Sequence, residues 1–442
     1  MTKRRVLIVS PHFPPVNAAD MQRVRMLLPF FHDNGWEAEV LAVAAEQVAM
    51  LQDSWLVRGL PVDVKVHRIR VLGLGWSFIP WLGTLGLRGL WPLASAGVRL
   101  LAGGGFDLVY FSTTVFDLLL LGPRWKQKHD VPFVLDYQDP WVNDYYREHP
   151  NVVPPGGQLK YSIISAIHRR AEPRVLRHCL GITSVSPAYP KQLDDRYPWF
   201  QRVPRLVQPF PGAQRDFERV KHLKGCNRFF DASDGNIHWV YIGVVIEGMY
   251  PALRALFKAI KNAMPEAKLK RLRMHFIGTT YSASGTAGQR VLLLATEYGL
   301  TDQVVEQCDR IPYADALRCL TEADALLAIG SDDPGYTASK IYPYLLARKP
   351  LLAVYHENSS IISLIQAVGG AVCVPLSMPV DEAALAAEVE RRWLLDRQYE
   401  KATTLDAAAF EPYTDQGCAQ ALCRFFERCL LHKDNAATQL EI

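Results

Sequence analysis

The chain alternates between short apolar runs and longer stretches in which apolar residues recur every three or four positions. Turn residues bound the short runs, which is typical of buried strands, whereas the longer stretches indicate amphipathic helices. The pattern predicts strands in the first half at 5–10, 37–43, 62–71, 106–112, 131–136 and 181–186. It predicts strands in the second half at 237–243, 271–278, 325–330, 350–355 and 371–376, with helices at 20–34, 251–263, 313–322, 338–347 and 414–431. Repeated strand–helix order predicts an α/β protein with doubly wound parallel sheets.

Two separate sheets are expected, because a stretch rich in proline, glycine and charged residues interrupts the alternation at 209–235. We predict a Rossmann-like N-terminal domain at 1–208, a linker at 209–235 and a Rossmann-like C-terminal domain at 236–412. A helix and tail at 413–442 follow, as a candidate to pack back on the N-terminal domain. Ligands of such sheets bind outside the carboxyl ends of the strands, so two facing sheets would form a central cleft between them.

Composition and charge narrow the function classes. The 442 residues are 49% hydrophobic and 21% charged, as in an ordinary globular protein. Lysine plus arginine exceeds aspartate plus glutamate by only 49 − 45 = 4, which argues against a nucleic-acid partner. None of the eight cysteines forms a CxxC pair, which favours reduced thiols in a cytoplasmic protein. Cys418 and Cys429 fit a buried helical stripe better than a metal site.

The segment 71–102 is the part of the chain that is most similar to a membrane sequence. It contains Trp76, Trp81 and Trp91, but prolines, glycines and an arginine interrupt it, so it falls short of the roughly 20 apolar residues of a spanning helix. Tryptophan favours membrane interfaces, which makes this segment a candidate for peripheral contact with the inner face of a membrane. A loop and helix packed over the cleft is the alternative.

Three motifs follow predicted strands and carry candidate chemistry. The first, after the strand at 5–10, contains His12, Asn17, Asp20 and Arg23, which are candidate ligand-binding residues and which the resemblance described below assigns to the acceptor. The loop leads into a helix, and backbone N–H groups there are suited to an anion. Neither GxGxxG nor GxxxxGK[ST] occurs, which removes the main support for a dehydrogenase or a P-loop enzyme.

The second motif, Leu135-Asp136-Tyr137-Gln138-Asp139-Pro140-Trp141, delivers two carboxylates to the end of a strand. Carboxylates in that position can orient sugar hydroxyls or act as a general base. We therefore place Asp136 and Asp139 among the candidate catalytic residues, and the resemblance described below adds Trp141 to the acceptor-binding ones. The alternative is that one of the two aspartates only caps the following turn.

The third motif runs from Ile329 through a loop rich in glycine and proline to a helix that begins with Ser339 and Lys340. A lysine beside a helix N-terminus can hold a diphosphate and stabilise its charge as it leaves. If Ser339 caps this helix, Pro343 is its fourth residue. A capped surface helix with a solvated lysine is the alternative.

With these motifs, the chain resembles the glycosyltransferases of the GT-B fold, most closely the retaining group called family 4. The resemblance spans nearly the whole chain and rests on RVLIVSPHFPP, GWEAEVLAV, VPFVLDYQDPW, VYIGVV, the loop at 309–312 and SKIYPYLLARKPLLAV. It implies transfer of a sugar from a nucleotide-sugar donor held by the C-terminal domain to a saccharide or lipid-linked acceptor held by the N-terminal domain. It also implies retention of configuration, with no metal and no cofactor.

Residue by residue, the resemblance implies that Lys340 contacts the donor phosphates, that Gly243 lets the donor approach and that Arg310 frames the nucleotide base. The family's two glutamates are replaced by Gly335 and Pro343. We expect tyrosine hydroxyls to substitute for them in donor binding, from Tyr336, Tyr342 or Tyr344.

The arginine that usually follows the glycine of the first C-domain strand is also replaced, by Val244. These departures leave a second hypothesis open, a catalytically silent GT-B protein that serves as a partner or scaffold for another glycosyltransferase.

Overall fold

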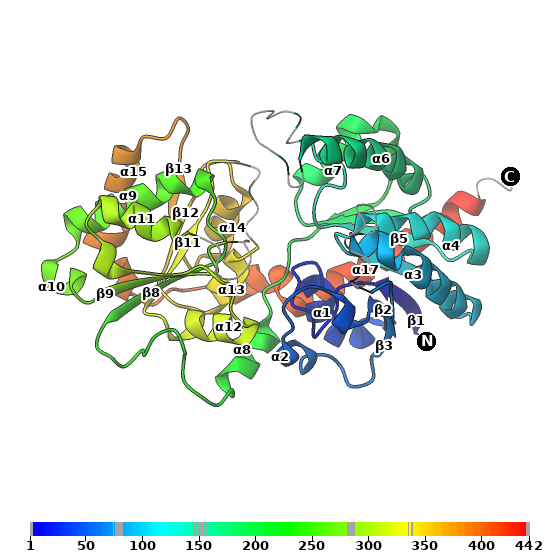
Figure 1. Ribbon diagram of the computed structural model, residues 1–442, viewed down its shortest axis with the longest axis horizontal. Coiled ribbons are helices and arrows are strands. Elements are labelled where there is room, and N and C mark those ends of the chain that lie inside the picture. The colour runs from blue at the N-terminus through cyan, green and yellow to red at the C-terminus, as the bar shows by residue number, and fades with distance from the viewer. Residues whose placement is uncertain are drawn as a thin grey trace. The chain divides into compact units, whose positions relative to one another are not determined.

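The computed structural model describes residues 3–73, 75, 83–144, 147, 154, 157–280, 288–334, 336 and 339–438. The chain forms two compact units (Figure 1). Unit 1 comprises Met1–Phe210 and Asp415–Ile442, and unit 2 comprises Pro211–Thr414. The C-terminal helix α17 (Asp415–Thr438) therefore belongs to the same unit as the N-terminal sheet.

Unit 1 contains a parallel sheet with the strand order β3-β2-β1-β4-β5-β6-β7 among its described residues. The strands are β1 (Arg4–Val9), β2 (Trp36–Val43), β3 (Lys65–Ile69), β4 (Leu108–Ser112), β5 (Phe133–Tyr137), β6 (Gly181–Ser184) and β7 (Arg205–Val207). The helices are α1 (Gln22–Leu27), α2 (Ser54–Val57), α3 (Leu85–Ala102), α4 (Leu121–His129), α6 (Gln158–Leu176), α7 (Ala188–Arg196) and α17. The order reverses between β1 and β4, which makes their carboxyl ends the switch point where ligands of such sheets bind.

Helices cover both faces of this sheet. On one face, α1 and α17 pack on β1, β2 and β4, and the buried residues of α17 include Cys418, Phe426 and Cys429, as the stripe pattern predicted. On the other face, the Trp125 ring of α4 stacks on Phe111 of β4. All eight cysteines are free thiols.

Unit 2 contains a second parallel sheet, with the strand order β10-β9-β8-β11-β12-β13 in the described part of the chain. The strands are β8 (Ile237–Ile242), β9 (Leu272–Ile277), β10 (Val304–Gln307), β11 (Ala325–Ile329), β12 (Leu351–His356) and β13 (Val372–Leu376). Its helices are α8 (Gln214–Lys221), α9 (Tyr250–Ala263), α10 (Glu266–Leu269), α11 (Arg290–Glu297), α12 (Tyr313–Glu322), α13 (Ile341–Leu346), α14 (Ser360–Val368), α15 (Glu382–Val389) and α16 (Ala407–Phe410). Here the order reverses between β8 and β11.

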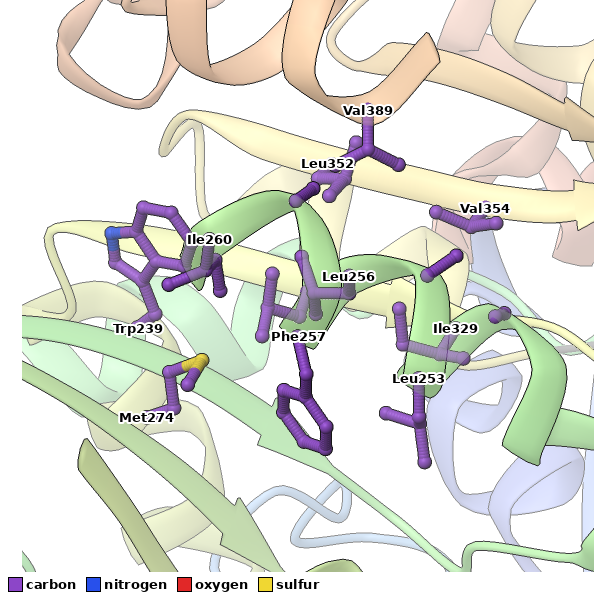
Figure 2. Packing of buried hydrophobic residues seen from close by; sticks show 14 of the residues in the cluster. Trp239, Leu253, Leu256, Phe257, Ile260, Met274, Ile329, Leu352, Val354 and Val389 are labelled. Carbon is purple, nitrogen blue, oxygen red and sulfur yellow. The ribbon is translucent and has the colours of Figure 1, made fainter. Parts of the chain in front are cut away.

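The core of unit 2 lies between α9 and the sheet. Figure 2 shows Leu253, Leu256, Phe257 and Ile260 of α9 packed among strand residues such as Trp239. Helices α11 and α15 cover the same face, and α12 and α13 lie on the opposite one (Figure 1). Both sheets are therefore buried on both faces, which explains why their strands are nearly continuous apolar runs.

The structure corrects several predicted boundaries. The helix expected at 20–34 ends as α1 at Leu27 and continues as two short 3-10 turns, because Pro29 cannot donate to the preceding turn. Residues 211–235, predicted as part of a linker, lie in unit 2 and include α8. Arg318 of α12 holds this segment by donating to the carbonyls of Leu223 and Cys226.

The segment 71–102 is described only in part, because Trp76 and Trp81 lie outside the described residues. Its remaining tryptophan, Trp91 on α3, is 78% exposed. Among the described helices, none combines the length and the apolar character needed to cross a membrane.

Candidate functional site

At the switch point of unit 2, the backbone of β8 ends at a glycine that no other residue can easily replace. Gly243 has φ +136°, in the region that favours glycine, and its N–H donates to the Ile277 carbonyl. A methyl group on Gly243 would overlap the Lys340 ammonium. The missing side chain therefore makes room for this lysine at the end of the strand.

Lys340 is a partly buried cation at the same edge. Its ammonium lies 5.3 Å from the Tyr241 ring centroid and donates to the Tyr241 hydroxyl at 3.4 Å. Burial, together with the positive charge of Arg310, lowers the pKa of Lys340 to about 8. In the described part of the chain, no carboxylate pairs with Lys340. Lys340 therefore has a second cation nearby and, within the described residues, no carboxylate to balance its charge. This environment suits an anion.

The other predicted donor-binding residues are only partly gathered here. Arg310 is exposed in the loop after β10, close enough to influence Lys340, and Tyr336 is half-buried after β11. Tyr342 is buried, and its ring stacks on Tyr413 with the centroids 5.6 Å apart. Ser339 is exposed.

Ser339 does not cap the helix that follows it. Lys340 occupies the N-cap position of α13, without a side-chain capping bond, and Pro343 is the third helical residue. The N–H groups of the first turn have no partner within a helix, so proline at this position removes no helical hydrogen bond.

The sequence suggested that Tyr344 binds the donor, but in the structure its hydroxyl binds the backbone of β8. Its hydroxyl accepts a hydrogen bond from the Ile242 N–H at 2.6 Å and donates to the Ile242 carbonyl at 3.2 Å. Tyr344 is 2% exposed, and burial raises the pKa of its phenol. A buried hydroxyl engaged in this way has no proton left to donate to a ribose, which argues against Tyr344 as a substitute for the glutamates of the family that the sequence resembles.

At the switch point of unit 1, a histidine and an aspartate pair behind the exposed edge. His12, after β1, lies with Nδ1 2.9 Å from the Asp20 carboxylate, which also accepts from the Thr113 hydroxyl at 3.0 Å. Since an ionised carboxylate only accepts, Nδ1 of His12 donates the proton in this hydrogen bond. The Asp20 carboxylate occupies the loop before α1, so this loop is less suited to an anion than the sequence suggested.

Asp139 is exposed beside this pair. Desolvation, reinforced by the negative charge of Asp20, raises the pKa of Asp139 to about 6. The carboxylate is thus ionised at neutral pH and remains basic enough to accept a proton.

Asp136, at the end of β5, lies below the exposed surface at the carboxyl ends of the strands. Its fully buried carboxylate accepts from Arg23 Nε at 2.9 Å, Ser112 Oγ at 2.8 Å and Thr183 Oγ1 at 2.8 Å. Arg23, also fully buried, donates in addition to the Gln208 carbonyl at 2.8 Å. These bonds tie α1 to three strands and the segment after β7. The geometry places Asp136 and Arg23 in the interior of unit 1, where neither side chain is exposed.

The two remaining predicted acceptor residues differ in access. Asn17 is half-buried, and its backbone N–H donates to the Leu51 carbonyl at 2.8 Å. Trp141 is 3% exposed and stacks on Phe116 with the centroids 5.9 Å apart. Its indole N–H has no hydrogen-bond partner in the described structure.

Sequence reasoning missed two polar residues that support the edge of unit 1. Thr113 and Gln138 bind the aspartates of unit 1, since Gln138 Nε2 donates to Asp136 at 2.8 Å. A hydroxyl or an amide directly after a buried strand is the signal that would have identified them. The described residues contain no group of three or more side chains suited to a metal ion.

No family model matches the chain, and no curated protein matches it. Solved structures, in contrast, match nearly the whole chain. HepE of Anabaena, in complex with UDP and glucose, is 14% identical with a TM-score of 0.55, over 99% of this chain and 100% of that one. A UDP-forming α,α-trehalose-phosphate synthase from Burkholderia xenovorans, in complex with glucose-6-phosphate, is 11% identical with a TM-score of 0.62, over 96% and 100%.

A trehalose 6-phosphate synthase from Burkholderia multivorans is 12% identical with a TM-score of 0.61, over 100% of this chain and 99% of that one. Likeness at this level of identity concerns the fold. The chain consists of two Rossmann-like units of the GT-B fold, the fold of nucleotide-sugar-dependent glycosyltransferases, as the sequence predicted.

Proposed function

We propose that this protein is a glycosyltransferase that uses a nucleotide-sugar donor. The observation that carries the proposal is the pair formed by Lys340 and Gly243 at the switch point of unit 2. A glycine that makes room at the strand end for a cation without a carboxylate partner suits the diphosphate of a nucleotide sugar. The names of the structural neighbours, which include complexes with UDP, support the same class of donor.

In this proposal, transfer breaks the bond between the sugar C1 and the oxygen of the donor phosphate, and the electron pair remains on the leaving diphosphate. The acceptor oxygen forms the new bond to C1, and its proton passes to a base or to the leaving phosphate. Lys340, with Arg310 nearby, stabilises that charge. Helix α13 has only six residues, so we assign most of the effect to the side chains. Independence from metals and retention of configuration rest on the resemblance to family 4. The anomeric configuration of the product, read by NMR, tests the second of these.

We assign the acceptor to unit 1. Asp139 is the residue that orients or deprotonates the acceptor hydroxyl, because it is exposed and ionised at neutral pH. His12 and Asp20 contribute to acceptor binding at the same edge. Asp136 and Arg23 hold the neighbouring segments in place and do not touch the acceptor, because both are buried. A saccharide or lipid-linked acceptor fits this assignment, and the exposed Trp91 supports peripheral contact with a membrane.

The test is nucleotide binding followed by turnover. UDP at 100 times its dissociation constant adds about 2.7 kcal/mol to stability, which calorimetry detects as a higher melting temperature. We expect UDP to stabilise the wild type, and Lys340→Ala to abolish this effect. Lys270→Ala is the matched control, because Lys270 is an exposed lysine of the same unit, paired with Glu266.

A panel of nucleotide sugars, with release of the nucleoside diphosphate as the signal, then identifies the donor. Failure of every nucleotide to bind the wild type would contradict the proposal. Binding without turnover of any donor would favour the silent scaffold, the hypothesis suggested by Pro343 and Val244 at positions where the family carries charged residues.

A further inference from the structure

The carboxyl end of β8 lacks a strand partner on one side. β8 pairs with β9 along its whole length, from Ile237 to Ile242. With β11 it pairs only at Trp239 and Val240, so the two strands separate before β8 ends. The N–H and the carbonyl of Ile242 both face this gap. Buried backbone groups of this kind are costly unless something binds them.

A single side chain binds both groups. The Tyr344 hydroxyl accepts from the Ile242 N–H at 2.6 Å and donates to its carbonyl at 3.2 Å. It therefore replaces the missing strand at the residue just before Gly243. On the other side, the Gly243 N–H donates to the Ile277 carbonyl of β9. The end of β8 is thus held from both sides.

The same helix that supplies the hydroxyl also supplies the cation. Lys340 and Tyr344 are four residues apart, so they share one face of α13, and the Tyr344 N–H donates to the Lys340 carbonyl at 3.4 Å. The lysine lies over Gly243, and the tyrosine binds Ile242. One helical turn therefore sets the distance between the strand end and the charge.

We propose that Tyr344 is a positioning residue of the diphosphate site, which holds Gly243 in register with Lys340. The inference rests on the proposed function, because it assigns the diphosphate to this edge. Loss of the hydroxyl leaves the two Ile242 groups without a partner, so the strand end shifts to find new ones. A shift of about 1 Å at a binding site weakens or misplaces a ligand strongly.

The decisive variant is Tyr344→Phe, with Tyr355→Phe as its matched control. Tyr355, on β12, is also buried in unit 2, and no hydrogen bond of its hydroxyl occurs among the described residues. Calorimetric titration with UDP and with inorganic pyrophosphate measures binding, and amide hydrogen exchange of residues 240–244 measures the strand end. We expect Tyr344→Phe to bind both probes about tenfold more weakly and to exchange faster at Ile242. The control should match the wild type in both.

A destabilised core alone would lower the melting temperature of both variants without a selective loss of binding. Tyr344→Gln, which keeps a donor and an acceptor, should retain more affinity than Tyr344→Phe. Unchanged binding in Tyr344→Phe, while Lys340→Ala binds nothing, would overturn this inference and leave the proposed function standing. Absence of binding in the wild type would overturn the proposed function instead. If neither variant folds, fast exchange of the Ile242 amide in the wild type still refutes the assignment.

Discussion

Replacing Lys340 by methionine should stabilise the protein while it abolishes donor binding. Burial, with the charge of Arg310, lowers the pKa of Lys340 from 10.5 to about 8. At about 1.4 kcal/mol per pH unit, this difference corresponds to about 3 kcal/mol by which folding disfavours the charged lysine. Methionine has a similar length and no charge, so it avoids this cost. Because Lys340 is only partly buried, we expect a gain of about 1–3 kcal/mol at pH 7.

The gain should depend on pH in a defined direction. Between pH 8 and 10.5 the unfolded chain holds a proton on Lys340 that the folded protein has released. The stability of the wild type therefore rises with pH across this window, whereas the stability of Lys340→Met lacks this contribution. The advantage of the variant is complete below pH 8 and disappears towards pH 10.5.

Scanning calorimetry at pH 7 and at pH 10.5 measures both effects. For a unit of this size, 1–3 kcal/mol raises the melting temperature by about 2–10 °C at pH 7. Addition of UDP should raise the melting temperature of the wild type and leave that of Lys340→Met unchanged. A variant less stable than the wild type at pH 7, or a gain that persists at pH 10.5, would show that Lys340 is not a desolvated charge.

Four further variants test other parts of the structure. Asp139→Asn should lower turnover more than UDP affinity and remove the fall in wild-type rate below about pH 6, whereas lost affinity at normal turnover would contradict its acceptor role. Arg23→Met should cost about 3–5 kcal/mol in denaturant unfolding, because it leaves Asp136 buried without its cation; a cost below 1 kcal/mol would refute this. Gly243→Ala should weaken UDP binding at least tenfold through its positive φ, and normal affinity would mean that the strand end relaxes freely. Trp91→Ser should release the protein from anionic vesicles at an unchanged melting temperature, and undiminished binding would exclude this tryptophan as the contact.

The periodicity of apolar residues was sufficient to predict most of the fold. Every strand with four or more consecutive buried positions, such as β4 or β12, was predicted near its observed place. The two strands that were missed lack such a run. β7 (Arg205–Val207) has three residues, and β10 (Val304–Gln307) alternates buried residues with exposed ones. Short edge strands depend on pairing with a neighbour, which a local pattern does not contain.

The sequence indicated which residue types lie at the candidate site, but it did not indicate how deeply each side chain is buried. Asp136 and Asp139 lie three residues apart in the sequence, yet one is fully buried and the other exposed. The difference depends on Arg23 and Thr183, which reach Asp136 from α1 and β6. Tyr344 shows the same limit, because its role follows from the separation of β8 from β11. Contacts between residues far apart in the sequence decide which of several polar side chains is buried and which stays exposed.

The two units carry opposite charges at equivalent places, and this difference supports different tasks. Both sheets reverse their strand order once, and the residues that follow the strands at each reversal are polar. In unit 1 these are the carboxylates Asp20 and Asp139, which would repel a diphosphate but can bind hydroxyl groups. In unit 2 they are Lys340 and Arg310, which repel each other and are best accommodated by an anion. Pro343 stands where the family that the sequence resembles carries a glutamate, and it leaves this division intact because it lies in the first turn of α13. In the proposed function, the charges that would select a phosphate are therefore present, and Pro343 would affect only the part of the donor that carries no charge.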